Sequence, residues 1–277
     1  MKTAVIVGAS ATGKEVYEKV KGLYKVLYFT DGNPVLIGKE IDSLTIYPIE
    51  HIMNDIPDVV IMGIMAGYEE KAEYLVSLGI PEGKIICKYV DLSYRAREEF
   101  AEKIGHIFQN GGVSGEIAEL GVYRGDFAKY LNKIFSNRKL YLFDTFEGFP
   151  DEDIEYEIKN NLLKKEVGRL TNTSVDYVLS RMTYPEKCII CKGYFPETAN
   201  GLEEKFAFVN IDVTLYKPVL AGLEVFWPQM VEGGYILVRD YFANIYEGPK
   251  KAVDEFAKKY NLKFVPIGDG SSVAFVK

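Results

Sequence analysis

The sequence predicts two α/β units in tandem, each built on a parallel sheet, with the second sheet finished by an antiparallel hairpin. Short apolar runs alternate with segments of helical spacing, the pattern of parallel strands joined by crossover helices. A glycine-bearing turn follows the first run of each half, at Gly8–Gly13 and at Gly121–Gly125. The 277 residues exceed one typical domain of about 150 residues, so two domains are expected.

The first predicted unit covers residues 1–90. Its expected elements are strands and helices in alternation: Thr3–Val7, a helix to about Lys21, Lys25–Thr30, Val59–Ile64, a helix at Tyr68–Leu78, and Lys84–Cys87. A charged segment, Asp91–Asn110, predicts a helical connector that ends at Gly111-Gly112. The expected domains are therefore 1–90, a connector at 91–111, and 112–277.

Two phosphate-binding motifs at Gly8–Lys14 are incomplete. Read as a P-loop, the segment places Glu15 where a serine or threonine must reach magnesium. Read as G-x-G-x-x-G, it has Ser10 in place of the central glycine. Asp31 nevertheless follows the second strand, where an acid would hold a ribose. A bound nucleotide and a scaffold or partner-docking role both stay open. By its strand–glycine–helix start and its Asp31–Pro34 turn, this unit resembles the small Rossmann-like modules of nucleotide-sugar and polysaccharide-modifying enzymes.

The second unit opens with a strand, a glycine turn, a helix and a strand. The two strands carry acids near their carboxyl ends, Glu119 and Asp144, which are 25 residues apart. Ligands of doubly wound sheets lie outside these strand ends, and a ribose carboxylate is expected at an offset of about 20 residues. The turn lacks a third glycine, and Tyr123-Arg124 fills it. Such a loop suits a nucleoside without a pyrophosphate, and S-adenosylmethionine (SAM) is the obvious candidate. A plain crossover with incidental acids is the alternative.

The remaining expected elements complete the sheet. They are strands Glu116–Leu120, Lys139–Phe143, Cys188–Lys192, Phe206–Ile211 and Tyr235–Val238, helices Phe127–Ile134, 174–182, 215–230 with Leu220, Leu223 and Phe226 inward, and Glu247–Lys259, and a hairpin of Phe264–Ile267 with Ser272–Val276. An irregular insertion after Pro150, acidic at first and then carrying Lys164-Lys165, is expected to be a lid or a solvated loop. A parallel sheet with this final hairpin is typical of class I SAM-dependent methyltransferases.

Composition excludes several classes of protein. A net charge of −7 without a lysine-arginine cluster argues against a nucleic-acid surface. No apolar run approaches about 18 residues, so no membrane span is expected. Three cysteines without secretory context indicate a reducing compartment, and we expect a cytoplasmic protein. Cys188 and Cys191 lie three apart in a predicted strand and so on opposite faces, which argues against redox or zinc chemistry.

Six segments carry a family resemblance. They are ELGVYRGDFA, LYLFDTFEGFP, GYFPETANGLE, VNIDVTLYKP, GGYILVRDY and KKAVDEF, between about Ser114 and Phe256. Together they resemble the macrocin O-methyltransferase family of SAM-dependent sugar O-methyltransferases. The acceptor implied is a sugar hydroxyl of a glycosylated metabolite, a nucleotide sugar or a polysaccharide. Class I architecture also implies that a homo-oligomer could form through the helices that flank the sheet.

The resemblance implies roles for individual residues. Three sets would bind SAM: Glu119, Gly121, Tyr123 and Gly125 at the methionine end, Asp144, Thr145 and Phe146 at the ribose and adenosine, and Gly193 and Tyr194 beside the adenine. Asp212 and Asp240 would hold a magnesium ion beside the acceptor hydroxyl, and Asp212 would be the general base. A carboxylate base is consistent with the sequence, because both histidines, His51 and His106, precede the catalytic domain.

Two departures from the family pattern concern the metal. Thr214 stands in place of the second acid of D-x-D, and Arg239 in place of the acid or histidine before Asp240. Three hypotheses stay open: a magnesium enzyme with Arg239 turned away, a metal-independent enzyme in which Arg239 pairs with Asp212, and a catalytically silent scaffold that binds SAM or a sugar nucleotide. Capping of the following helix is the structural alternative for Asp212.

Overall fold

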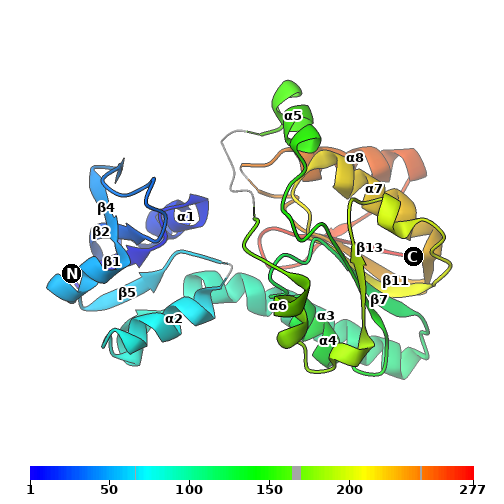
Figure 1. Ribbon diagram of the computed structural model, residues 1–277, viewed down its shortest axis with the longest axis horizontal. Coiled ribbons are helices and arrows are strands. Elements are labelled where there is room, and N and C mark those ends of the chain that lie inside the picture. The colour runs from blue at the N-terminus through cyan, green and yellow to red at the C-terminus, as the bar shows by residue number, and fades with distance from the viewer. Residues whose placement is uncertain (66, 164–169, 244) are drawn as a thin grey trace. The chain divides into compact units, whose positions relative to one another are not determined.

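The computed structural model describes residues 1–65, 67–163, 170–243 and 245–277 (Figure 1). It divides into two compact units, Met1–Arg95 and Ala96–Lys277. The boundary lies within helix α3 (Lys88–Gly111), which contains the whole segment expected as a connector, 91–111. The α3 residues Ala101, Ile104 and Phe108 are buried in a core of the second unit, so much of this helix is part of that unit rather than a free linker.

The first unit is a six-stranded sheet with helices. Its elements are β1 (Thr3–Val7), α1 (Ala11–Val20), β2 (Lys25–Asp31), β3 (Glu40–Ile41), β4 (Leu44–Pro48), β5 (Val59–Met62), α2 (Tyr68–Ser77) and β6 (Ile85–Ile86). The strand order is β3-β4-β2-β1-β5-β6, parallel except for the β3–β4 pair. The predicted strands and helices are present. The sequence reading missed β3 and β4, a two-residue strand and a short strand that ends in proline.

Asp31 and three glycines organise the strand ends of this unit. A Cβ at Gly13 would collide with the carbonyl oxygen of Gly8, and a Cβ at Gly63 would lie 2.9 Å from the Gly13 Cα, so the glycines allow close packing of backbone. The carboxylate of Asp31 accepts hydrogen bonds from the amides of Ala9 and Asn33, both at 2.8 Å. The glycines and Asp31 therefore have structural roles in the first unit. Nucleotide binding by this unit stays a prediction.

The second unit is a seven-stranded sheet covered on both faces. Its further elements are β7 (Glu116–Leu120), α4 (Ala128–Ile134), β8 (Leu140–Asp144), α5 (Asp151–Lys159), α6 (Val175–Ser180), β9 (Cys188–Lys192), β10 (Phe206–Ile211), α7 (Tyr216–Phe226), β11 (Met230–Val238), α8 (Gly248–Tyr260), β12 (Val265–Pro266) and β13 (Val273–Val276). The order is β12-β13-β11-β10-β7-β8-β9, in which β13 is antiparallel to both of its neighbours. The predicted class I methyltransferase fold is confirmed.

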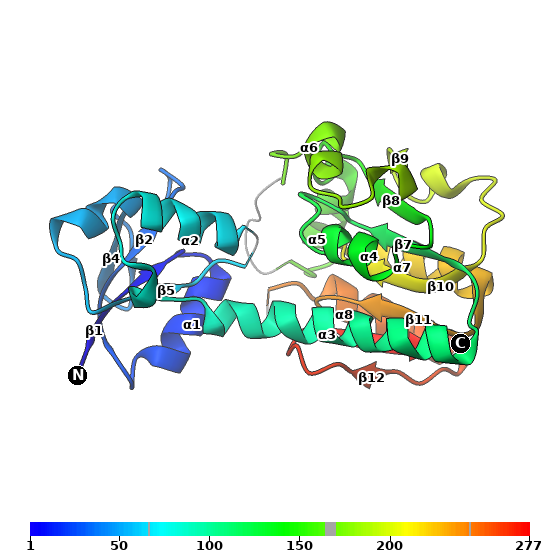
Figure 2. The same cartoon turned by 90° about the horizontal axis from the view of Figure 1, so that it is seen from below.

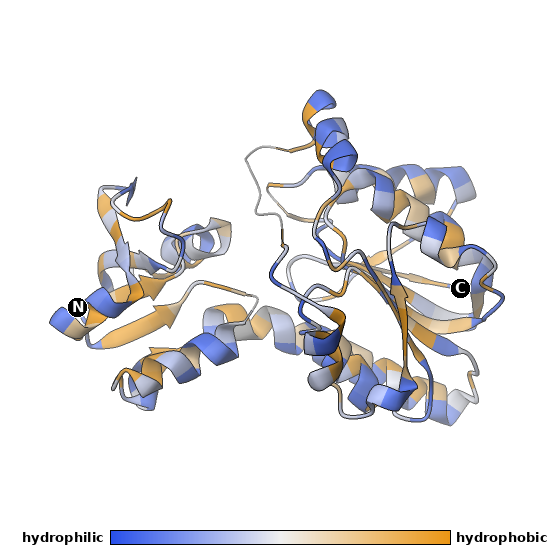
Figure 3. Cartoon of the chain, viewed as in Figure 1, coloured by the Kyte–Doolittle hydropathy of each residue, from blue (hydrophilic) through white to orange (hydrophobic). Residues whose placement is uncertain are grey.

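Alternating side chains of the strands form two cores. Ala118 and Phe143 pack with α7 and α8, whereas Ile117 and Leu142 pack with α3, α4 and α6. Figure 1 shows these helix groups on opposite faces of the sheet, and Figure 2 shows α3 running along one face. In Figure 3 apolar residues are concentrated on the strands and on the helix faces that cover them. Because successive side chains of a strand point to opposite faces of the sheet, each strand contributes buried residues to both cores.

Local contacts define three features of the second unit. Ser174 is the N-cap of α6, because its Oγ accepts a hydrogen bond from the amide of Tyr177 at 3.1 Å. Leu223 and Phe226 of α7 face inward as predicted and are fully buried, and Leu220 is partly buried and packs against the same core. The acidic insertion begins with helix α5 rather than irregular chain.

Two further points concern the insertion and the membrane. Lys164-Lys165 lie outside the described residues. Of the helices in the described ranges, none combines the length and the apolar character needed to cross a membrane.

Candidate cofactor and acceptor site

A cavity lies at the carboxyl ends of β7, β8, β9 and β10. Its wall is formed by the loops that follow these strands and by the start of the insertion. Seven of the residues predicted from sequence line it: Gly121, Tyr123, Asp144, Thr145, Gly193, Tyr194 and Asp212. Four others do not, namely Glu119, Gly125, Phe146 and Asp240. The sheet therefore brings most of the predicted site together at the edge where ligands of this fold class are found.

Gly121 is required by a crossing of two loops. Its φ is +88°, and a Cβ on it would lie 2.6 Å from the carbonyl oxygen of Asp212. Any side chain would push the loop after β7 away from the loop after β10. Gly125 also has a positive φ, of +75°, but a Cβ there would face Val178 and Met182, so Gly125 fits the turn against α6 instead of lining the cavity.

Asp144 holds the glycine loop in place. Its Oδ2 accepts hydrogen bonds from the amides of Val122 and Tyr123, both at 2.7 Å, and its Oδ1 accepts one from the amide of Phe146 at 2.7 Å. A carboxylate has about four lone-pair directions, so about one remains for a ribose hydroxyl. Phe146 is buried in the core between the sheet and α4, which explains its absence from the cavity wall.

Two neighbouring side chains complete this corner. Tyr123 has a φ of +48°, and its hydroxyl donates to Asn172 Oδ1 at 2.6 Å, which ties the loop to the far end of the insertion. The Thr145 hydroxyl donates to the carbonyl oxygen of Gly148 at 2.8 Å and closes the turn after β8. Both contacts fix the shape of the cavity rim.

Glu119 lies behind the cavity, fully enclosed between β7 and β10. Its Oε1 accepts a hydrogen bond from Asn210 Nδ2 at 2.8 Å, whereas Oε2 has no partner among the described residues. Burial raises the pKa of Glu119 well above its usual value, and the nearby Asp212 charge adds to this rise. The protonated, neutral carboxyl is thus favoured in the folded protein.

Asp212 directly follows β10 and contacts two arginines. Arg239 Nη1 lies 3.0 Å from Oδ1, and Arg97 Nη1 lies 2.9 Å from Oδ2. Burial alone would raise the pKa of Asp212, but the two guanidinium groups outweigh it and hold that pKa below its usual value. The carboxylate is therefore ionised at neutral pH.

Arg97 was not anticipated from the sequence. It comes from α3, 115 residues before Asp212, and its guanidinium lies 4.4 Å from the centre of the Phe127 ring. Only 4 % of its side chain is exposed. A buried arginine needs a carboxylate partner, but a single cation in a charged helix gives no sequence signal of where that partner lies.

Asp240 lies on the other side of Arg239. Its Oδ1 is 3.6 Å from Arg239 Nε and accepts a hydrogen bond from the Ser271 hydroxyl at 3.2 Å. Its φ is +63°, an unusual value that turns the chain sharply after β11. Burial raises the pKa of Asp240, and Arg239 partly offsets this rise.

Helix α5 contributes two buried acids that the sequence reading missed. Asp153 lines the cavity, accepts a hydrogen bond from the Tyr194 hydroxyl at 3.1 Å and lies 3.2 Å from Lys217 Nζ. Glu157, one turn later, accepts a hydrogen bond from the amide of Tyr216 at 2.6 Å, at the start of α7. The spacing of four residues is the available signal, because it places both acids on one face of the helix. These contacts fasten the first part of the insertion beside the cavity.

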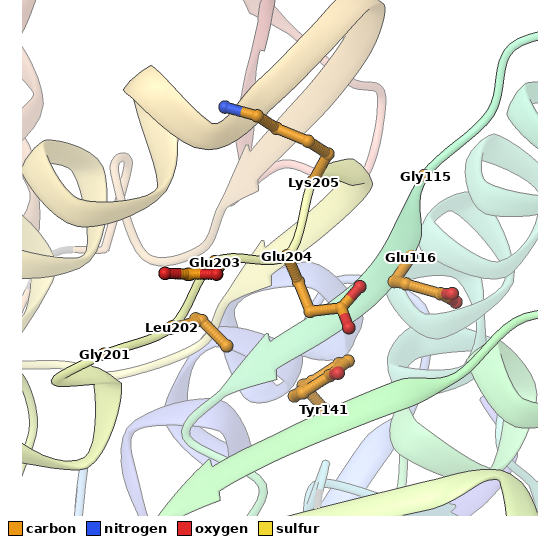
Figure 4. Close-up of a pocket in the computed structure, with 8 residues that line it drawn as sticks. All are labelled: Gly115, Glu116, Tyr141, Gly201, Leu202, Glu203, Glu204 and Lys205. Atoms are coloured by element: carbon orange, nitrogen blue, oxygen red, sulfur yellow. The ribbon is translucent and has the colours of Figure 1, made fainter.

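A second hollow lies at the opposite, amino-terminal end of the strands (Figure 4). It is lined by Glu116, Tyr141, Glu203, Glu204 and Lys205, among others. Burial and the hydrogen bond to Glu204 raise the pKa of Tyr141 to about 12. The hollow is open and rich in carboxylates, and it lies at the strand ends remote from the glycine loop. We therefore place the candidate site at the carboxyl edge.

Comparison with known proteins agrees with this geometry. Residues 93–274 match the family model described as macrocin-O-methyltransferase (TylF). The chain belongs to the macrocin O-methyltransferase family. The resemblance inferred from the six sequence segments is thereby confirmed.

Two curated relatives come from Streptomyces. One is 8-demethyl-8-(2,3-dimethoxy-alpha-L-rhamnosyl)-tetracenomycin-C 4′-O-methyltransferase of Streptomyces olivaceus. It is 22% identical over 166 residues, which is 54% of this chain and 61% of that protein. Demethyldecarbamoylnovobiocin O-methyltransferase of Streptomyces niveus is 26% identical over 165 residues, with the same coverage. The match thus spans about three fifths of the length of each relative.

Two solved structures share the fold. The O-methyltransferase NovP superposes with a TM-score of 0.55 at 21% identity, covering 66% of this chain and 79% of its own. The calicheamicin methyltransferase CalS11 superposes with a TM-score of 0.55 at 17% identity, covering 76% and 93%. At these identities the likeness establishes the class I architecture.

The magnesium site implied by the macrocin O-methyltransferase family does not fit the residues present. Arg239 lies between Asp212 and Asp240, and Thr214 offers no carboxylate. Within the described ranges, no three His, Cys, Asp or Glu side chains are grouped so that they could hold a metal ion. A divalent ion about 4 Å from one guanidinium would be repelled by on the order of 8 kcal/mol at an effective dielectric constant of about 20. The arginine faces Asp212, as in the second of the three hypotheses.

Proposed function

We propose that this chain is a SAM-dependent O-methyltransferase that acts on a sugar hydroxyl of a glycosylated metabolite, a nucleotide sugar or a polysaccharide. The observation that carries the proposal is the cavity in which the Gly121 loop, the Asp144 carboxylate and the Asp212 carboxylate meet, in a member of the macrocin O-methyltransferase family. The names of the Streptomyces relatives specify O-methylation, one of them of a rhamnosyl-bearing compound, which supports a sugar acceptor here.

Different residues of the cavity are proposed to bind the methionine part and the adenosyl part of SAM. The bare backbone at Gly121 allows close approach of the methionine part, and the fixed loop at Tyr123 keeps that surface in shape. Asp144, Thr145 and the Gly193-Tyr194 turn flank the place proposed for the adenosyl group. When bound, SAM supplies an electrophilic methyl group on a sulfonium.

Catalysis then depends on placing the acceptor oxygen in line with that methyl group. Asp212 stands in the cavity wall as a carboxylate, and we propose that it orients the acceptor hydroxyl and takes its proton. Its lowered pKa makes it a weak base for a free hydroxyl. The proton becomes far more acidic as the new C–O bond forms, so a weak base positioned at the oxygen is sufficient.

Isothermal titration calorimetry with SAM tests the proposal most directly. We expect one SAM per chain, and S-adenosylhomocysteine as a competing ligand at the same site. Transfer of labelled methyl groups to a panel of rhamnosides, nucleotide sugars and oligosaccharides would then identify the acceptor. If neither adenosyl compound binds the folded protein, the assignment is wrong.

A catalytically silent scaffold is the second candidate. The observation that favours it is that arginines contact both oxygens of Asp212. These contacts make the carboxylate a weaker proton acceptor. A protein that binds SAM with one-to-one stoichiometry but methylates no member of the acceptor panel would support the scaffold over the enzyme.

The setting proposed for either function is the cytoplasm. The small number of cysteines, three without secretory context, supports a reducing compartment, and the net charge of −7 supports a small-molecule or saccharide partner over nucleic acid. A homo-oligomer formed through helices on the faces of the second sheet is part of the same proposal.

A further inference from the structure

We infer that the Arg239 guanidinium, backed by Arg97, occupies the position a divalent cation would need between Asp212 and Asp240, so that this chain works without a metal at its acceptor site. The inference rests on the proposed function, because an acceptor site in which a side chain replaces a cation presupposes a methyltransferase. Its support is the set of contacts that Arg239 makes.

Arg239 bridges the two carboxylates. Its Nη1 is within reach of both oxygens of Asp212, at 3.0 Å and 3.4 Å, and its Nε is 3.6 Å from Asp240 Oδ1. A magnesium ion shared by these two acids would have to stand about 2.1 Å from an oxygen of each. The guanidinium fills that space.

Arg97 closes the other side of Asp212. It donates from Nη1 to Oδ2 at 2.9 Å, and its stacking on Phe127 holds the guanidinium plane in place. When all four side chains are ionised, the charges of the two arginines balance those of Asp212 and Asp240 within this set of four. An added divalent ion would give these four side chains an excess of two positive charges, which a partly buried cluster disfavours.

The two arginines differ in access. The side chain of Arg239 is 21 % exposed, whereas that of Arg97 is 4 % exposed. Arg239 is therefore the group that can meet the acceptor, where a planar cation can hold a sugar oxygen as its negative charge develops. Arg97 acts through Asp212 and is a positioning residue.

Binding of Mn²⁺, followed by electron paramagnetic resonance on the full-length protein, tests the inference. Arg239→Gln removes the bridging charge, and Arg239→Asp also supplies a third acid beside Asp212 and Asp240. Arg138→Gln is the matched control for Arg239→Gln, because Arg138 bonds the backbone of Gly115 and Val113 at the amino end of the sheet and its loss changes the net charge by the same amount. Circular dichroism and the melting temperature verify that each variant is folded.

We expect no Mn²⁺ binding below about 1 mM by the wild type and by Arg138→Gln, and affinity at least about tenfold higher in Arg239→Gln and Arg239→Asp, as expected when a like charge is removed from a cation site. Two results would overturn the inference: one Mn²⁺ bound by the wild type and lost in Asp212→Asn, or no gain of affinity in either folded Arg239 variant.

SAM calorimetry separates this inference from the proposed function. Under the inference, the SAM dissociation constant of the wild type is the same with EDTA and with Mg²⁺, and a shift of tenfold between the two buffers would count against it. If SAM binds in neither buffer, the methyltransferase assignment fails, while the Mn²⁺ titration still decides whether Arg239 excludes a cation.

Discussion

The carboxylate of Asp144 and the backbone amide of Tyr123 are 2.7 Å apart, so the end of β8 holds the loop that follows β7. Three amides converge on this one side chain, and the cavity wall depends on them.

Asp144→Asn should weaken both the fold and SAM binding. The variant keeps one acceptor oxygen and turns an NH₂ group towards backbone N–H donors, so at least one charge-assisted hydrogen bond is lost. We expect a loss of about 1.5–3 kcal/mol in the free energy of unfolding, measured by urea denaturation, and weaker SAM binding by calorimetry. Asp176→Asn, an exposed acid on α6, is the control and should leave SAM affinity unchanged. Wild-type affinity in the folded Asp144→Asn protein would contradict the role given to this loop.

Asp212→Ala should abolish turnover while leaving SAM affinity nearly unchanged. The variant removes the proposed base, for which a loss of at least about 100-fold in kcat is expected, measured with labelled SAM and the acceptor found in the panel. It also leaves Arg97 and Arg239 without their shared carboxylate, so the melting temperature should fall.

A double variant separates these two effects. Asp212→Asn combined with Arg239→Gln removes one charge of each sign, and its stability should recover towards the wild type, while its turnover should stay low. Equal turnover in Asp212→Ala and the wild type would exclude Asp212 as the base.

Glu119→Gln should change how stability depends on pH. Because burial raises the pKa of Glu119, the folded protein holds a proton that the unfolded chain releases above its own pKa of about 4.3. The stability contributed by this group is therefore full below that pH and is lost as pH rises towards the folded pKa. Glutamine stays neutral and keeps the bond from Asn210. Urea titrations at pH 5 and pH 8 should show a smaller fall in the variant, and an identical fall in both proteins would argue against a buried neutral carboxyl.

Gly121→Ala should disrupt the site through backbone strain. Its positive φ and the 2.6 Å approach of a Cβ to the Asp212 carbonyl oxygen predict a cost of about 1–3 kcal/mol, together with loss of SAM binding. Gly268→Ala is the matched control, since nothing lies within 4 Å of a Cβ at that exposed position. The comparison uses urea denaturation and calorimetry, and similar values for the two variants would refute the close crossing of the loops.

The sequence was sufficient for the elements whose apolar residues are continuous. Phe206–Ile211 was predicted with the bounds that the structure shows, because it is a short and nearly continuous apolar run whose six residues are all buried. Glu116–Leu120 was also predicted with its bounds, from three apolar residues and the glycine turn that follows it. Helix α5 was missed because its inward face is formed by Asp153 and Glu157 instead of apolar residues. Such a face is specified by partners on other elements, such as the amide of Tyr216, which no local pattern displays.

The site was predictable where it follows strand ends and unpredictable where it depends on distant pairs. Gly121, Asp144 and Asp212 each come directly at or after a strand, so topology alone gathers them. The sequence showed that Arg239 departs from the family pattern, but only the fold shows that its side chain points towards Asp212. Arg97 was missed entirely, because its partner lies 115 residues away.

The hydrogen bonds of Asp31 have a consequence beyond this protein. In the first unit Asp31 fastens the amide of Ala9, just as Asp144 in the second unit fastens the amides of Val122 and Tyr123. An aspartate at the end of the second strand of such a sheet thus has a structural role, because it accepts backbone hydrogen bonds from the loop after the first strand with or without a bound ribose. The presence of that acid in a sequence is therefore weak evidence for coenzyme binding. A carboxylate lone pair that remains available after the backbone hydrogen bonds are made is the better criterion.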